Sequence, residues 1–76
     1  MANSQNKRSI MIAGHRTSIS LEDAFWEALG ELATKDGRSM AGLISEIDRK
    51  RTETGRAGTS LSAAIRLYVL ERLRKP

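Results

Sequence analysis

Polar and apolar residues alternate over residues 16–21, and this alternation predicts a β-strand that leads into a helix. Its odd-numbered residues, Thr17, Ile19 and Leu21, would face a core, and its even-numbered residues would face outward. A single strand leaves both of its hydrogen-bonding edges unpaired. We therefore expect this strand to pair with its copy in a second chain.

A second run of β-prone residues, at 9–13, precedes this strand and ends at Gly14. The apolar positions change phase there, from even-numbered residues before Gly14 to odd-numbered residues after it. A bulge or bend near Gly14 would make residues 9–21 one long strand, whereas a turn would make a hairpin. We favour the bent strand and keep the hairpin as the alternative.

Two helices are predicted over residues 23–35 and 39–51, where apolar residues recur at helical spacing. Gly37 suits the left-handed position after the first helix, and Ser39 is a good N-cap for the second. Ser20 suits two competing roles. It would either face outward from the strand or cap the first helix in a capping-box arrangement.

A third helix is predicted over residues 60–75, after a linker at residues 52–59 that holds two glycines. Between Leu61 and Leu70 only two residues are strongly polar. A helix that is apolar on most sides must be buried on most sides, and a chain this short has little with which to cover it. The third helix therefore favours an intertwined dimer.

The chain has 76 residues, with 13 Lys and Arg against 9 Asp and Glu, and a net charge of +4. The charge is segregated: residues 1–21 hold three basic residues, residues 22–36 five acidic residues and one lysine, and residues 37–76 nine basic and four acidic residues. This segregation suits a polyanionic partner on one face, although ordinary surface charge explains it equally well.

Catalysis, metal binding and membrane insertion find little support in the sequence. There is no cysteine, and the single histidine, His15, cannot form a metal site within one chain. The acidic residues line a solvated helix face, and the glycines form no phosphate-binding loop. No run approaches the ~20 apolar residues of a membrane span. We therefore expect a cytoplasmic protein that is not an enzyme, with no catalytic residue, metal, cofactor or membrane partner.

The order of the predicted elements resembles the ribbon-helix-helix family of bacterial DNA-binding proteins. The resemblance is closest over residues 16–51. It is carried by Ser18-Ile19-Ser20-Leu21-Glu22, by Leu29 and Leu32, and by Gly37-Arg38-Ser39-Met40-Ala41 before Leu43-Ile44. Residues 13–22 are similar to a small, mostly proteobacterial subgroup that has a further C-terminal helix. The resemblance implies a mainly α fold with one β-strand, in which two chains intertwine and share an intermolecular antiparallel ribbon.

For this chain the resemblance implies a homodimer that binds double-stranded DNA through the major groove. The residues expected to face the bases are Arg16, Ser18 and Ser20. Those expected at the DNA backbone are Lys7 and Arg8, on a flexible basic arm at residues 1–8, with His15, Arg38, Ser39 and Met40. The expected dimer core consists of Ile19, Leu21, Phe25, Leu29, Leu43, Ile44, Ile47, Ile65 and Val69.

The function that the resemblance implies is transcription regulation, most simply as a repressor. An antitoxin is one alternative, in which the C-terminal segment neutralises a toxin. A dimerisation or protein-interaction module without DNA binding is the other, because Ser18 and Ser20 are short and specify bases weakly.

Overall fold

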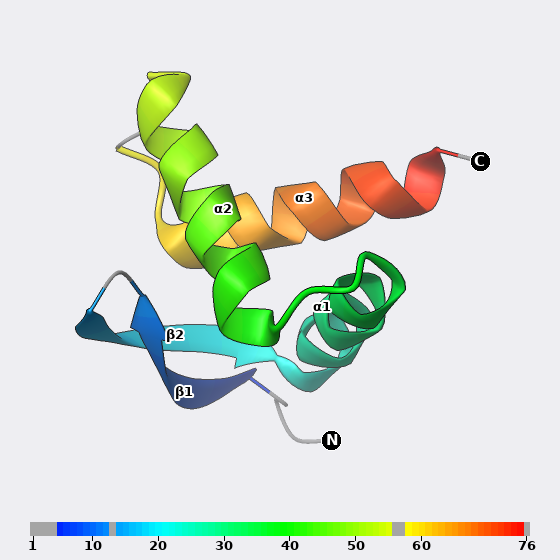
Figure 1. The fold of residues 1–76 in the computed structure, drawn as a ribbon, viewed down its shortest axis with the longest axis horizontal. Coiled ribbons are helices and arrows are strands. Elements are labelled where there is room, and N and C mark those ends of the chain that lie inside the picture. Colours follow the sequence, from blue (N-terminus) through cyan, green and yellow to red (C-terminus); the bar gives the residue numbers. More distant parts are fainter. Residues whose placement is uncertain (1–4, 13, 56–57, 76) are drawn as a thin grey trace.

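The computed structural model describes residues 5–12, 14–55 and 58–75 of the chain. Along the sequence the elements are β1 (Gln5–Ile12), β2 (His15–Glu22), α1 (Asp23–Lys35), α2 (Met40–Glu53) and α3 (Leu61–Arg74). The two strands form one antiparallel sheet, and the helices pack together on one side of it (Figure 1). The helices that the sequence predicts at 23–35, 39–51 and 60–75 thus correspond to α1, α2 and α3, with α2 two residues longer at its end.

β1 and β2 form a hairpin within one chain, so the expectation of a single bent strand over residues 9–21 is wrong. Ile12 pairs with His15 across a two-residue loop. Gly14 in this loop has a φ of +83°, a conformation that glycine adopts without steric cost, and the chain therefore reverses instead of bending. In this register each even-numbered residue of β1 faces an odd-numbered residue of β2, which explains the change of phase in the sequence.

The ribbon also differs from expectation in its partner and its length. β2 pairs with β1 of the same chain, which occupies the place expected for a second copy. Pairing extends from the loop back to Gln5 and Glu22, so Lys7 and Arg8 are strand residues and do not belong to a flexible arm. Residues 1–4 of the predicted arm lie outside the described residues.

The connection between α1 and α2 is fixed by backbone hydrogen bonds. The Arg38 N–H donates to the Ala33 carbonyl at 2.8 Å, and the Gly37 N–H donates to the Thr34 carbonyl at 3.0 Å. Gly37 has a φ of +69°, as this type of helix ending requires. The Ser39 hydroxyl then accepts the Gly42 N–H at 3.0 Å and begins α2 directly after the turn.

The start of α1 does not use the cap that the sequence allowed. Ser20 lies within β2, and Glu22 is the N-cap residue of α1. The Glu22 side chain accepts no capping hydrogen bond from the first turn of α1. Ser20 therefore takes the strand position of its two predicted roles.

A single chain buries most of the residues expected between two chains. Ile19, Leu21, Leu29, Leu43, Ile44, Ile47, Ile65 and Val69 are buried in the core of one chain, and Phe25 is half-buried at its edge. These residues therefore pack together within a single chain, and their expected place in a dimer core stays a prediction. α3 is buried on one side and leaves Leu67, Leu70 and Leu73 exposed by 45%, 48% and 66%.

Candidate nucleic-acid interface

The outer face of the β1–β2 hairpin, which points away from the helices, is the strongest candidate for a binding surface. It carries Lys7, Ser9 and Met11 from β1 and Arg16, Ser18 and Ser20 from β2. These residues are exposed, apart from Ser20, which is half-buried. The register places Lys7 opposite Ser20, Ser9 opposite Ser18 and Met11 opposite Arg16. One chain therefore presents a complete two-stranded ribbon with a polar and basic outer face.

The three predicted base-facing residues, Arg16, Ser18 and Ser20, lie together on this face. At the end away from the loop, the Ser20 carbonyl accepts a hydrogen bond of 2.8 Å from the Ser62 hydroxyl on α3. This contact ties one end of the ribbon to the helices. The loop end of the ribbon, with Arg16, projects away from that contact.

β1 contributes residues to the outer face that the sequence reading missed. The sequence predicts Ser9 and Met11 in a run of β-prone residues and Lys7 on a flexible arm, whereas all three lie on the outer face of β1. The sequence carries only a weak signal for this face, because polar Ser9 precedes Ile10 but Met11 is apolar like its neighbours Ile10 and Ile12.

Arg8 lies on the inner side of the hairpin and is not available for a DNA phosphate, in contrast to expectation. Its Nη2 atom forms an ion pair with Asp23 Oδ1 at 2.5 Å, and its guanidinium lies over the Trp26 ring, 4.6 Å from the ring centroid. Both partners belong to the first turns of α1. Arg8 therefore fastens β1 to α1 through a charge pair and a cation–π contact.

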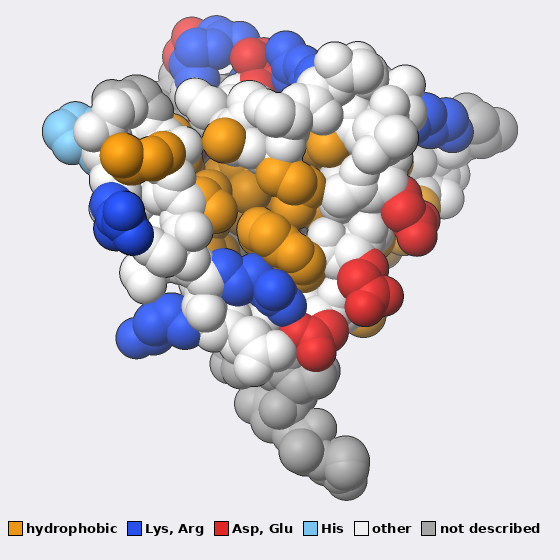
Figure 2. All heavy atoms as spheres, turned by 60° about the horizontal axis from the view of Figure 1, so that its bottom comes forward, with side chains coloured by type: hydrophobic (Ala, Val, Ile, Leu, Met, Phe, Trp, Pro, Cys, Tyr) orange, Lys and Arg blue, Asp and Glu red, His pale blue; other side chains and the backbone are white. Residues whose placement is uncertain are grey.

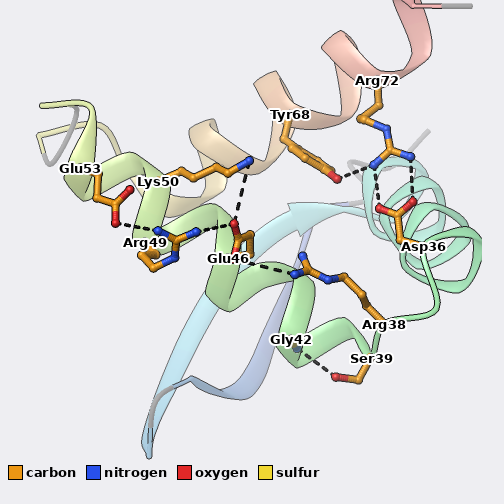
Figure 3. A network of polar contacts seen from close by, with 10 residues as sticks. All are labelled: Asp36, Arg38, Ser39, Gly42, Glu46, Arg49, Lys50, Glu53, Tyr68 and Arg72. Carbon is orange, nitrogen blue, oxygen red and sulfur yellow. Dashed lines mark hydrogen bonds and ion pairs between the residues drawn. The ribbon is translucent and has the colours of Figure 1, made fainter.

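The other predicted backbone contacts lie apart from the outer face. Arg38, Ser39 and Met40 are at the start of α2, whose buried residues pack against the inner side of the hairpin. The Ser39 hydroxyl accepts the Gly42 N–H (Figure 3). The Leu43 N–H is the first that donates to a backbone carbonyl in the helical pattern, that of Ser39. The N–H groups of Met40 and Ala41 come before it and have no acceptor within the helix. His15 is exposed beside the hairpin loop.

Charged residues along α2 moderate the positive charge at its start. Arg38 Nη2 lies 3.9 Å from Glu46 Oε1, and Glu46 also binds Arg49 at 2.5 Å (Figure 3). The hydrogen bond from Arg49 and the nearby positive charges hold the pKa of Glu46 below its usual value. Arg38 is thus an exposed guanidinium whose contact with Glu46 is long and weak, and among the described residues it leaves donors that can bind another anion.

α3 is held to the rest of the chain by two arginine–carboxylate pairs. Arg66 binds both oxygens of Glu22. Arg72 binds both oxygens of Asp36 at 2.8 and 3.1 Å and also donates to the Tyr68 hydroxyl, as Figure 3 shows. These hydrogen bonds lower the pKa of Glu22 and of Asp36. The two pairs fix α3 at both ends of α1.

A hydrophobic patch lies next to the ribbon. Figure 2 shows hydrophobic side chains gathered between the hairpin and α1, with Lys and Arg on the hairpin side and Asp and Glu on the α1 side. Half-buried apolar residues of these elements are Ile10, Phe25, Trp26 and Ala28. An apolar area bordered by charges of both signs is typical of a contact surface for another protein.

Other kinds of site find no support in the described residues. No group of three or more His, Asp or Glu side chains in residues 5–12, 14–55 and 58–75 is placed to hold a metal ion. None of the helices described has the length and apolar character needed to cross a membrane.

Comparison with known proteins identifies the family. The family model for the ribbon-helix-helix domain matches residues 5–73, which include both strands and nearly all of α3. No curated protein and no solved structure matches the chain. The matched region covers most of the 76 residues, and the antiparallel two-stranded ribbon followed by helices is consistent with this fold. The chain therefore belongs to the ribbon-helix-helix domain family, whose members are generally DNA-binding transcription regulators or antitoxins.

Proposed function

We propose that this protein is a sequence-specific transcription regulator, acting as a repressor, that inserts the outer face of its β1–β2 hairpin into the DNA major groove. The observation that carries the proposal is the composition of this face, with Lys7 and Arg16 among small polar residues on a two-stranded ribbon. The major groove of B-DNA admits a two-stranded ribbon. Basic side chains on the ribbon neutralise phosphates and release counterions, which favours binding.

Different residues contact the DNA bases and the DNA backbone. Arg16 has the length and the two parallel donors needed for guanine O6 and N7. The start of α2 offers the N–H groups of Met40 and Ala41, the positive end of the helix dipole and the exposed guanidinium of Arg38. This combination binds a phosphate at the edge of the groove and sets the register of the ribbon.

We further propose that the protein acts as a homodimer that joins through the hydrophobic patch between the hairpin and α1. The half-buried side chains of Ile10, Phe25 and Trp26 gain burial there, and the family generally forms dimers. Each chain buries an apolar core of its own residues, which supports association of two folded chains without intertwining. The two ribbons then contact two half-sites of one operator.

The experiment that tests DNA binding is selection of sequences from random duplex DNA with the full chain, followed by anisotropy titrations at several salt concentrations. We expect a consensus site and an affinity that falls steeply as salt increases. Absence of binding even at low salt would overturn the proposal. Salt-sensitive binding without any consensus would limit the function to non-specific DNA association.

An antitoxin is the second candidate, and the exposed leucines of α3 favour it. Leu67, Leu70 and Leu73 form an apolar stripe on the part of α3 that follows Ser62 and Arg66, the residues that contact the end of the ribbon. A toxin bound there would leave the DNA-binding face free. Co-purification of a small partner protein that Leu70→Glu abolishes, with DNA binding retained, would support this role. A Leu70→Glu variant that keeps the same partner would exclude α3 as its binding surface.

A further inference from the structure

Met11 is an exposed apolar side chain in the middle of a polar and basic surface. This residue is 56% exposed, and among the described residues of the hairpin it is the large hydrophobic residue that is exposed to solvent. The other apolar residues of β1, Ile10 and Ile12, point to the inner side. Met11 therefore does not contribute to the core, although it lies on the strand that supplies part of it.

The register pairs Met11 directly with Arg16. The Cβ atoms of directly opposed residues in an antiparallel pair lie roughly 4.5–5.5 Å apart. Successive base pairs of B-DNA are separated by about 3.4 Å along the helix axis. A ribbon in the major groove therefore brings these two side chains to base pairs that are adjacent or one step apart.

We propose, building on the DNA-binding function proposed above, that Met11 and Arg16 together recognise a thymine beside a guanine. The Met11 side chain contacts the C5-methyl group of thymine, and the Arg16 guanidinium donates to O6 and N7 of guanine. The thymine methyl is the apolar group that the major groove offers, and a flexible thioether adapts well to it. The specificity of the ribbon is thus concentrated at its loop end.

The remaining outer-face pairs fit a supporting role. Ser9 faces Ser18, and both hydroxyls are short and accept or donate to any base. Lys7 faces Ser20 at the end that Ser62 ties to α3. A lysine there suits a phosphate contact, because its ammonium group is a flexible point charge. The pair at the loop end is the one that combines a long donor with an exposed apolar group.

The test removes the proposed contact from each side in turn. The DNA is the site selected by the wild-type chain, and each of its thymines is replaced by deoxyuridine, which lacks the methyl group. Wild-type protein, Met11→Ala and Met11→Gln are titrated against each duplex by fluorescence anisotropy. Leu70→Ala is the matched control, since Leu70 has similar exposure but lies on α3. Circular dichroism verifies that each variant is folded.

We expect one thymine whose replacement weakens wild-type binding about fourfold, the effect of burying a methyl-sized group. Met11→Ala and Met11→Gln should bind the thymine and deoxyuridine duplexes equally at that position, whereas Leu70→Ala should retain the difference. The proposal is overturned if the Met11 variants keep the full methyl dependence, or if no thymine in the site shows any. Failure of the wild-type chain to bind DNA would instead overturn the proposed function itself.

Discussion

The guanidinium of Arg66 binds both carboxylate oxygens of Glu22, with Nε 2.9 Å from Oε1 and Nη2 3.1 Å from Oε2. Glu22 is the last residue of β2 and the N-cap of α1, so this pair joins α3 to the point where the ribbon meets the helices. Ser62 adds a second contact one turn earlier on α3. The orientation of the β1–β2 hairpin therefore depends on α3, the helix that follows the strands, α1 and α2 in the chain.

This pair makes the stability of the protein sensitive to acid. The Arg66 hydrogen bond lowers the pKa of Glu22 below its usual value of 4.5, so the ionised carboxylate is favoured in the folded state. The stability that it contributes is present above the unfolded pKa and is lost as the pH falls through the lowered folded pKa. We expect Glu22→Gln to lower the melting temperature at neutral pH and to have little effect in strong acid.

Thermal unfolding followed by circular dichroism between pH 2 and pH 7 measures this difference. Glu31→Gln, at an exposed position of α1, is the matched control and should leave the pH profile unchanged. Parallel curves for wild type and Glu22→Gln over the whole range would show that the Arg66 pair contributes nothing to the acid sensitivity.

Arg16→Ala should weaken binding to the selected DNA site and relax its sequence preference. Loss of a bidentate contact to guanine costs ~1–3 kcal/mol of discrimination. Competition titrations with the selected site and with variants at each guanine provide the measurement. Arg74→Ala, at the exposed end of α3, removes an equal charge and should keep the preference. An unchanged preference in Arg16→Ala would exclude this residue as a base contact.

Lys7→Ala and Arg8→Ala should have opposite effects although the residues are neighbours. Lys7 lies on the outer face, so its loss should reduce the salt dependence of DNA binding by about one unit of slope and leave the melting temperature unchanged. Arg8 binds Asp23 and Trp26, so its loss should lower the melting temperature and leave the salt slope unchanged. The reverse outcome would mean that β1 is turned over relative to the structure.

Ile65→Ala should destabilise the protein by ~2–5 kcal/mol, because it leaves a cavity where α3 packs into the core. Urea unfolding monitored by Trp26 fluorescence measures the loss. The control Leu70→Ala truncates an exposed residue of the same helix and should change the stability by no more than ~0.5 kcal/mol. Similar losses for both variants would indicate that α3 is covered by another chain in solution.

The helices could be predicted from the sequence because their signals are local. Apolar residues at helical spacing mark each helix, and Gly37 and Ser39 adopt the conformations that their positions suggested. The family followed from the order of these elements and was confirmed by the comparison.

The ribbon was harder to predict because the choice between a bent strand and a hairpin depends on contacts between residues that are distant in sequence. A glycine after an apolar run permits a bulge or a turn equally, and pairing of residues 5–12 with 15–22 decides between them. Arg8 was assigned to DNA because its charge is visible in the sequence, whereas its partners on α1 are not. The sequence predicts the apolar residues at a dimer interface because it does not show that β1 covers them within one chain.

A ribbon made from two copies of one strand repeats every outward residue through a two-fold axis. Here the two strands differ in sequence, since Lys7, Ser9 and Met11 stand opposite Ser20, Ser18 and Arg16. A substitution in β1 therefore alters one side of the surface without an identical change facing it. Such a ribbon has a direction of its own, so the half-site proposed for each ribbon has no need to be a palindrome, even where a homodimer places two such half-sites in one symmetric operator.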